Sequence, residues 1–336
     1  MKIMITGVAG FIGSTLALRL LARGDSVYGV DNMNDYYDVR LKEARLKRFA
    51  DHKNFKFEKL DIADRAGMAA MFKREKFDAV MNLAAQAGVR YSIENPHAYI
   101  DANVVGFCNV LEGCRHSGVK HLVFASSSSV YGANTNMPFS EHNNVDHPVS
   151  LYAATKKANE AMAHSYAHLW NLPTTMFRFF TVYGPWGRPD MALFKFTRGI
   201  LEGTPIDIYN DGEMYRDFTF VKDLVRAIRL LIDAVPERPA NREDVAEGDS
   251  LSPVAPFRVV NIGNSDKVRL LDFIEAIEIE CGREAIRNYL PMQKGDVPAT
   301  WAEAGLLHRL TGYRPATDVR EGVRAFVAWY RDHYRI

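Results

Sequence analysis

Two side chains that could transfer a proton stand four residues apart, Tyr152 and Lys156, in the stretch Leu-Tyr-Ala-Ala-Thr-Lys. On a helix, this spacing places both side chains on one face. A cation beside a phenol stabilises the phenolate and lowers a pKa that is ordinarily about 10, so Tyr152 is a candidate general base. The spacing also occurs by chance in many helices, so the surrounding elements must supply the context.

A hydroxyl-rich loop precedes that pair. An expected strand at residues 121–125 runs into Ser126-Ser-Ser-Ser-Val-Tyr-Gly132, and the predicted helix with Tyr152 begins behind a candidate N-cap, Ser150. A hydroxyl beside a phenolate can shorten the proton path or bind a developing alkoxide. Serines at a strand end are also ordinary turn residues, so this loop alone decides nothing.

The N-terminal glycines predict a dinucleotide-binding turn. An expected strand at residues 3–6 leads into Gly7-Val-Ala-Gly10-Phe-Ile-Gly13, and an apolar-periodic run at residues 16–21 then predicts a helix. Gly7 makes the tight turn, and Gly10 leaves room for a pyrophosphate at the helix N-terminus. Gly13 lets the helix pack close to the strand.

The acid after the second expected strand favours NAD over NADP. Residues 26–30 form that strand, and Asp31 follows at the spacing typical of an acid that binds the adenosine ribose hydroxyls. A 2′-phosphate would be repelled by this carboxylate, and Asn32 follows where an arginine would be needed.

Alternating strand and helix patterns predict an α/β fold with a doubly wound parallel (Rossmann) sheet. Further strands are expected at residues 55–60, 79–83 and 174–179. In such sheets, ligands bind at the carboxyl ends of the strands. Five candidate residues lie at such ends: Gly10, Asp31, Asp61, Ala84 and Ser126.

The order of elements becomes less regular after residue 180. We expect residues 1–180 to form the dinucleotide-binding domain, with a return segment near 218–263, and residues 181–336 to form a smaller C-terminal α/β substrate-binding domain. Residues 236–256 are rich in proline and charge and predict a mobile surface loop.

Composition excludes several classes of protein. The 336 residues carry a formal net charge of +1, which argues against a dedicated nucleic-acid or anionic-membrane surface. The three cysteines have no metal-binding spacing, so we expect free thiols, a reducing compartment and no metal. Without a long apolar run or leader-like segment, the sequence predicts a soluble cytoplasmic protein.

Taken together, the glycine turn, the serine loop and Tyr152-x-x-x-Lys156 resemble the extended short-chain dehydrogenase/reductase family of nucleotide-sugar enzymes over essentially the whole chain. Longer strings closely resemble the UDP-glucuronate 4-epimerases within that family. These strings are Asp31-Asn-Met-Asn-Asp-Tyr-Tyr37, Ala84-Ala-Gln-Ala-Gly-Val-Arg-Tyr-Ser92, Ser126 to Gly132, and Arg178-Phe-Phe-Thr-Val-Tyr-Gly-Pro-Trp-Gly-Arg-Pro-Asp190.

The resemblance implies roles for individual residues. Tyr152 would be the base, Lys156 would bind the nicotinamide ribose, and Ser127 with Ser128 would supply hydroxyls. The implied NAD-binding residues are Gly7, Gly10, Phe11, Ile12, Gly13, Asp31, Asn32, Asp61, Ile62, Leu83, Ala84, Ala85, Asn103, Ser126, Tyr152, Lys156 and Phe179. The implied substrate-binding residues are Gln86, Arg90, Ser127, Ser128, Tyr152, Thr181, Arg188, Arg216 and Asp296. An arginine that contacts the nucleotide in related galactose epimerases is replaced here by Met292-Gln293.

The activity implied by the resemblance is interconversion of UDP-glucuronate and UDP-galacturonate, with tightly bound NAD recycled in each turnover. Related decarboxylases and dehydratases place an acid just before Val-Tyr-Gly, where this chain has Ser128 and Ser129, which favours simple epimerisation. A UDP-glucose or UDP-hexosamine 4-epimerase and a non-catalytic NAD-binding sensor are the alternatives. The family also implies a homodimer formed through helices near residues 103–116 and 153–170.

Overall fold

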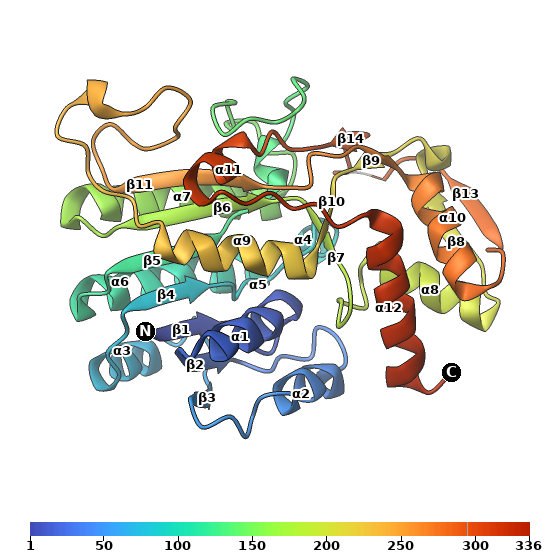
Figure 1. Ribbon diagram of the computed structural model, residues 1–336, viewed down its shortest axis with the longest axis horizontal. Coiled ribbons are helices and arrows are strands. Elements are labelled where there is room, and N and C mark those ends of the chain that lie inside the picture. Colours follow the sequence, from blue (N-terminus) through green and yellow to red (C-terminus); the bar gives the residue numbers. More distant parts are fainter. Residues whose placement is uncertain (294) are drawn as a thin grey trace.

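The computed structural model describes residues 1–293 and 295–336, and its centre is a seven-stranded sheet with helices on both faces (Figure 1). The strand order is β11-β6-β5-β4-β1-β2-β3, and every neighbouring pair is parallel. The strands are β1 (Lys2–Thr6), β2 (Ser26–Asp31), β3 (Phe55–Lys59), β4 (Ala79–Asn82), β5 (His121–Ala125), β6 (Thr174–Phe179) and β11 (Phe257–Ile262). The order reverses between β1 and β4, so the predicted doubly wound sheet is confirmed.

Three strand ends differ from the sequence prediction, and the first is that of β3, which ends at Lys59, one residue before its predicted end. Asp31 is the last residue of β2 because its backbone continues the ladder opposite Lys59 of β3. β4 ends at Asn82, one residue early, where the N–H of Leu83 is shared between the Thr6 hydroxyl at 3.1 Å and the Thr6 carbonyl at 3.3 Å. All three differences lie at the carboxyl edge, where the chain leaves the sheet to form loops.

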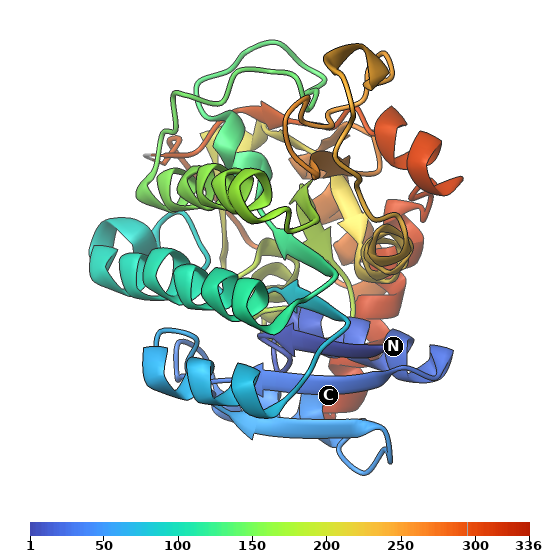
Figure 2. The ribbon, with the colours of Figure 1, turned by 90° about the vertical axis from the view of Figure 1, so that its left-hand side faces the viewer.

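Alternation along the strands explains the two helical layers. In β1, Ile3 and Ile5 face the core under α1 (Phe11–Arg23), α9 (Val221–Asp233) and α11 (Gly305–Thr311). Met4 points the other way, into the core under α3 (Arg65–Arg74), α6 (Phe107–Ser117) and α7 (Leu151–Trp170), which Figure 2 shows side by side on that face. Burial on both faces explains why the strands are apolar throughout.

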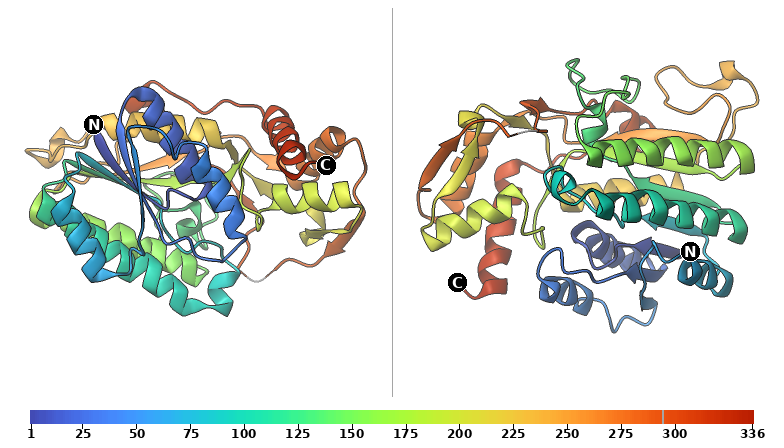
Figure 3. Two further views of the ribbon diagram at one scale, coloured as in Figure 1. Left: turned by 90° about the horizontal axis from the view of Figure 1, so that it is seen from below. Right: turned by 180° about the vertical axis from the view of Figure 1, so that it is seen from behind.

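A smaller group of elements lies beyond the carboxyl edge of the sheet (Figure 3). It contains the strand pairs β7 (Thr181–Tyr183) with β10 (Phe218–Phe220) and β8 (Ile206–Tyr209) with β13 (Arg287–Leu290), and a small sheet of β9 (Tyr215–Arg216), β12 (Val268–Arg269) and β14 (Ala299–Thr300). Its helices α8 (Ala192–Glu202), α10 (Leu270–Cys281) and α12 (Val319–Tyr334) enclose a separate apolar core. That core supports the predicted division at residue 180, which we retain as a proposal.

The predicted loop at residues 236–256 connects α9 to β11 and contains one short 3-10 turn, Arg242–Asp244. Its last part contacts the strand that follows. Asp249 pairs with Arg258 of β11 at 2.9 Å, and the His164 ring of α7 lies 2.9 Å from the Ser252 hydroxyl. The mobility of this loop stays a prediction. Separately, no helix in the described part of the chain is long and apolar enough to cross a membrane.

A buried histidine makes folding stability depend on pH. His121 is 2% exposed, its Nδ1 lies 3.0 Å from the Ile232 carbonyl of α9, and its Nε2 lies 2.9 Å from the Thr175 hydroxyl of β6. Since a carbonyl only accepts, Nδ1 carries the proton of a neutral ring. Burial lowers the pKa of His121 to about 4.

The depressed folded-state pKa fixes the direction of the effect. The contribution of His121 is complete above the unfolded pKa of about 6.5 and is lost as pH falls toward 4, because only the unfolded chain binds the proton in that window. We expect urea unfolding to show stability falling through this range by up to about 3 kcal/mol. The His121→Gln variant should flatten that part of the profile, and an unchanged slope would contradict the assignment.

Candidate active site

Tyr152 and Lys156 lie buried in the first turns of α7. Ser150 caps that helix as predicted, since its hydroxyl accepts the Ala153 N–H at 3.1 Å. Lys156 is 4% exposed and donates to the Ala125 carbonyl, at the carboxyl end of β5, at 2.9 Å. Burial lowers the pKa of Lys156 to about 8, and Glu160 acts in the opposite direction.

The groups that act on the Tyr152 hydroxyl differ from the sequence prediction, which named Lys156 as the cation that lowers its pKa. Burial raises the pKa of Tyr152, and the groups that oppose this rise are the Ser127 hydroxyl and the Arg188 guanidinium. Tyr152 also packs edge-on against Tyr99, with ring centroids 6.1 Å apart. The predicted hydroxyl of Ser127 and the predicted substrate-binding residue Arg188 therefore both act on the base, while tuning by Lys156 stays a prediction.

In the serine loop, the Ser126 hydroxyl contacts α7 and the Ser127 hydroxyl caps a short helical turn. Ser126 donates to a carboxylate oxygen of Glu160 at 2.6 Å, so its side chain faces α7. Ser127 caps the 3-10 turn Ser128–Tyr131, where its hydroxyl accepts the Ser129 N–H at 3.2 Å. Capping fixes the Ser127 oxygen next to Tyr152.

A buried ion pair behind the site was missed by the sequence analysis. Arg178 of β6 donates to both Glu160 oxygens, Nε at 3.1 Å and Nη2 at 2.9 Å, and its guanidinium stacks on Tyr131 with 4.9 Å to the ring centroid. Arg178 thereby joins β6, α7 and the serine loop. A charged residue inside the apolar strand Thr-Thr-Met-Phe-Arg-Phe was the available signal, because such a charge requires a buried partner.

The glycine turn leaves a cradle at the N-terminus of α1. A Cβ at position 13 would lie 2.2 Å from the Gly7 carbonyl oxygen, and one at position 7 would lie 2.9 Å from the Ala84 nitrogen. Gly7 also has a φ of +71°, which favours glycine. Gly10 caps α1 without a side chain, so the first N–H groups of the helix remain available to an anion.

The acid at the end of β2 closes this cradle. Asp31 accepts the Ala9 N–H at 3.1 Å and the Met33 N–H at 2.9 Å, which uses two of about four acceptor positions of a carboxylate and leaves others for a diol. Asn32 donates to Asp61 at 2.9 Å, so the two predicted adenosine-binding acids lie near each other. The other predicted NAD-binding residues lie at nearby element ends. Phe11 and Ile12 begin α1, and Ile62 follows Asp61. Leu83 and Ala85 follow β4, and Phe179 ends β6.

The chain after β4 is fixed by Asn103. Its amide oxygen accepts the Gln86 N–H at 2.8 Å, and its amide nitrogen donates to the Gln86 carbonyl and to the Thr155 hydroxyl, each at 3.0 Å. Asn103 lies in a π-helical segment, Ile100–Gly106, ahead of α6. These contacts place Gln86 beside the helix that carries Tyr152.

Three predicted substrate-binding residues, Arg90, Arg216 and Asp296, lie near one another at a second point. Arg90 donates to Asp296 at 3.2 Å and lies 4.7 Å from the centroid of the Tyr209 ring. Arg216 donates to the carbonyls of Val297 at 2.8 Å and Pro298 at 3.2 Å. Segments that are far apart in the sequence thus meet here, with a cation, an aromatic face and a carboxylate.

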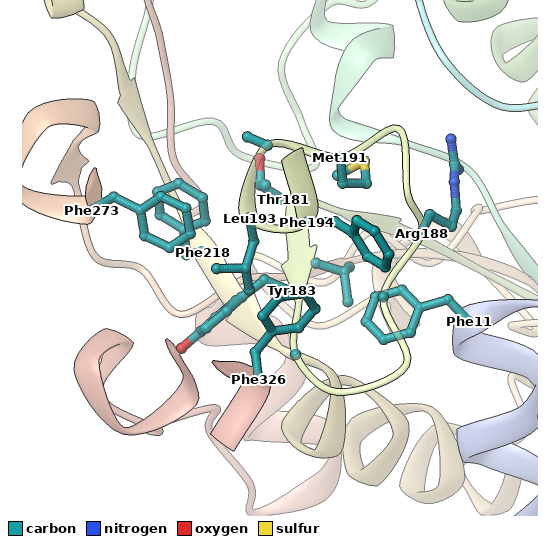
Figure 4. A pocket seen from close by; sticks show the side chains of 14 residues that line it. Phe11, Thr181, Tyr183, Arg188, Met191, Leu193, Phe194, Phe218, Phe273 and Phe326 are labelled. Atoms are coloured by element: carbon teal, nitrogen blue, oxygen red, sulfur yellow. The ribbon is translucent and has the colours of Figure 1, made fainter. Parts of the chain in front are cut away.

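Thr181 and Arg188 flank a small apolar cavity between β7, α8 and α12 (Figure 4). Figure 4 shows the Arg188 guanidinium extending away from the aromatic lining of this cavity. Arg188 instead pairs with Asp190, Nε to Oδ1 at 3.0 Å, a partner that the sequence analysis did not identify. The described residues include no group of ligands suited to a metal ion.

Residues 3–245 match the NAD dependent epimerase/dehydratase family. The chain belongs to this family. The NAD site that the family name implies fits the residues present, because the glycine cradle has no room for side chains and Asp31 keeps free acceptor positions.

Relatives within the family are similar over the full chain. A probable UDP-glucuronate 4-epimerase of Rhizobium meliloti (strain 1021) is 52% identical over 336 residues, which are 100% of this chain and 98% of that protein. The structure of UDP-glucuronic acid 4-epimerase from Bacillus cereus with UDP-glucuronic acid and NAD has a TM-score of 0.88 at 30% identity and covers 99% of this chain and 100% of that one. The structure of a UDP-glucose 4-epimerase from Thermotoga maritima with UDP-glucose has a TM-score of 0.85 at 29% identity. The match covers 99% of this chain and 100% of that one.

Proposed function

We propose that this protein is an NAD-dependent 4-epimerase that interconverts UDP-glucuronate and UDP-galacturonate. The observation that carries the proposal is the position of Arg188, a partly buried guanidinium whose Nη1 has no protein partner among the described residues and whose charge opposes the rise in the pKa of Tyr152. An arginine beside the base suits a sugar that carries a carboxylate next to the reacting carbon. The relatives named above as UDP-glucuronate 4-epimerases support the same substrate.

The residues of the chain then have separate tasks. Tyr152 takes the proton from the C4 hydroxyl, and Ser127 binds the same oxygen. Lys156, anchored on the Ala125 carbonyl, binds the nicotinamide ribose. The glycine cradle and Asp31 would hold NAD, which would supply the hydride acceptor and donor for C4.

The carboxylate needs control because the 4-ketone of a glucuronate is a β-keto acid. Such an acid loses carbon dioxide when its C5–C6 bond lies parallel to the carbonyl π orbitals. Arg188 and the Thr181 hydroxyl hold the carboxylate out of that alignment. Ser128 and Ser129 stand where related decarboxylases and dehydratases place an acid, so no carboxyl group at these two positions assists elimination or decarboxylation.

A neutral-sugar epimerase is the second candidate, and one observation favours it. Asp190 pairs with Arg188, so the guanidinium does not require a carboxylate from the substrate. The likeness to the UDP-glucose 4-epimerase of Thermotoga maritima points the same way.

A panel of UDP-sugars separates the two candidates. Purified protein without added reductant is incubated with UDP-glucuronate, UDP-glucose or UDP-N-acetylglucosamine, and the anomeric signals are followed by NMR. We expect UDP-glucuronate to be converted at least about tenfold faster than either neutral sugar. Faster conversion of a neutral sugar would favour the second candidate, and no conversion of any sugar would contradict both.

We also propose that the protein acts in the cytoplasm and as a homodimer joined through α6 and α7. Apolar side chains exposed along the helical segment before α6 and at the end of α7 support that interface, among them Ile100 (40% exposed) and Leu169 (64%).

A further inference from the structure

Asp190 binds one edge of the Arg188 guanidinium. Arg188 Nε donates to Oδ1 at 3.0 Å and Nη2 donates to Oδ2, while Nη1 has no protein partner among the described residues. The two side chains are 22% and 28% exposed, so the pair is shielded without being closed off. Burial opposes the charge on Asp190, but Arg188 lowers the pKa of that carboxyl below its ordinary value, so the pair is ionised.

The backbone on which Arg188 stands is fixed from the cofactor side. Arg45 of α2 (Val39–Lys47) is fully buried and donates to the carbonyl of Trp186 at 2.7 Å and that of Gly187 at 3.1 Å. The same guanidinium donates to Ala9 in the glycine turn at 3.3 Å. The residues just before Arg188 therefore cannot move independently of the cradle for NAD.

The Asp190 carboxylate is supported from that side as well. The Tyr36 hydroxyl lies 3.5 Å from Asp190 Oδ2, and the Tyr36 ring packs on Tyr91 with centroids 4.9 Å apart. Backbone and side-chain contacts thus define where Arg188 points, and that direction brings it within electrostatic reach of Tyr152.

A guanidinium offers two forked edges to carboxylates, Nε with Nη2 and Nη1 with Nη2. Asp190 takes the first. We propose that Asp190 is a positioning residue that fixes the plane of Arg188, so that the second edge binds the sugar carboxylate in the orientation that prevents decarboxylation. This inference rests on the proposed function, and it assigns a task to Asp190 that affinity for the substrate does not require.

Loss of Asp190 should increase the fraction of the 4-ketone intermediate that loses carbon dioxide instead of being reduced to the epimer. Without Asp190, Arg188 still attracts the uronate, and a competing anion is gone, so binding is retained or tightened. The guanidinium is then free to rotate, so the C5–C6 bond of the bound ketone lies parallel to the carbonyl π orbitals more often. The C5–C6 bond then breaks and carbon dioxide leaves, the electron pair of that bond forms the C4–C5 enolate, and a proton from water adds at C5. Because NAD has already accepted the C4 hydride, each carbon dioxide leaves one NADH and one UDP-4-keto-pentose.

The test uses the NAD-loaded enzyme with Asp190→Ala and Asp190→Asn, the second of which preserves volume if the first folds poorly. We expect the ratio of carbon dioxide released to epimer formed to rise by about tenfold or more in Asp190→Ala, and by less in Asp190→Asn, which keeps one acceptor. The dissociation constant for UDP-glucuronate, measured by calorimetry, should stay level or fall. Asp233→Asn is the matched control, because it breaks an Arg–Asp pair (with Arg23, 2.9 Å) on the surface.

Two results would overturn the inference. An unchanged product ratio in both Asp190 variants, with wild-type epimerisation intact, would remove the positioning role and leave the proposed function standing. Weaker binding together with an unchanged ratio would show that Asp190 merely supports the fold. If the wild-type enzyme does not convert UDP-glucuronate at all, the proposed function fails first and the inference fails with it.

Discussion

Replacing Tyr152 by phenylalanine should lower turnover by about 10²–10⁴-fold while NAD binding is preserved. The ring of Tyr152 keeps its contact with Tyr99, but no group remains to take the C4 proton. Initial rates by NMR and NAD content of the purified protein measure the two effects.

A second tyrosine on the same helix provides the control. Tyr166 of α7 also loses one hydroxyl contact on mutation to phenylalanine, to Glu112 at 2.7 Å, but it lies outside the site. We expect Tyr166→Phe to stay near the wild-type rate. A non-catalytic NAD-binding sensor would show no activity to lose, and equal rates for the two variants would exclude Tyr152 as the base.

Replacing Arg188 by alanine should weaken UDP-glucuronate binding by roughly 30-fold, about 2 kcal/mol, because a charge-assisted forked contact is lost. UDP-glucose has no carboxylate, so its affinity in the same variant is the internal control. Carbon dioxide release per turnover should also rise. Calorimetry with both nucleotides and a carbon dioxide assay measure these effects.

The Arg188→Ala change leaves Asp190 without its cation, which could repel the uronate by itself. The double variant Arg188→Ala/Asp190→Asn removes that carboxylate charge and should still bind UDP-glucuronate weakly. Arg188→Lys keeps the charge but loses the fork, so we expect intermediate affinity. Wild-type affinity in the double variant would mean that Arg188 does not bind the sugar carboxylate.

Much of the fold was predictable because its signals are local. Apolar runs between turn residues predicted β5 and β6 at the bounds the structure has, and the glycine spacing predicted the turn between β1 and α1. The placement of Asp31 and Asp61 followed from strand ends meeting at one edge of a parallel sheet.

The remaining contacts depend on partners distant in sequence. Arg45 reads as an ordinary charged residue of a surface helix, and its carbonyl partner in Trp186 is 141 residues away. Glutamate and arginine are residue types that usually lie at the surface. Glu160 and Arg178 are nevertheless buried, because each is paired with the other. Grouping Arg90 with Arg216 and Asp296 came from the family resemblance, since no spacing rule connects three such separate loops.

Conversion of UDP-glucuronate labelled with deuterium at C4 tests the central claim most directly. If the C4 hydride leaves and returns within one active site, the UDP-galacturonate formed in ordinary water, without added nicotinamide, should keep the deuterium at C4. NMR and mass spectrometry of the isolated product measure the retained label. Loss of the label to solvent, or no formation of UDP-galacturonate, would contradict the proposed epimerisation.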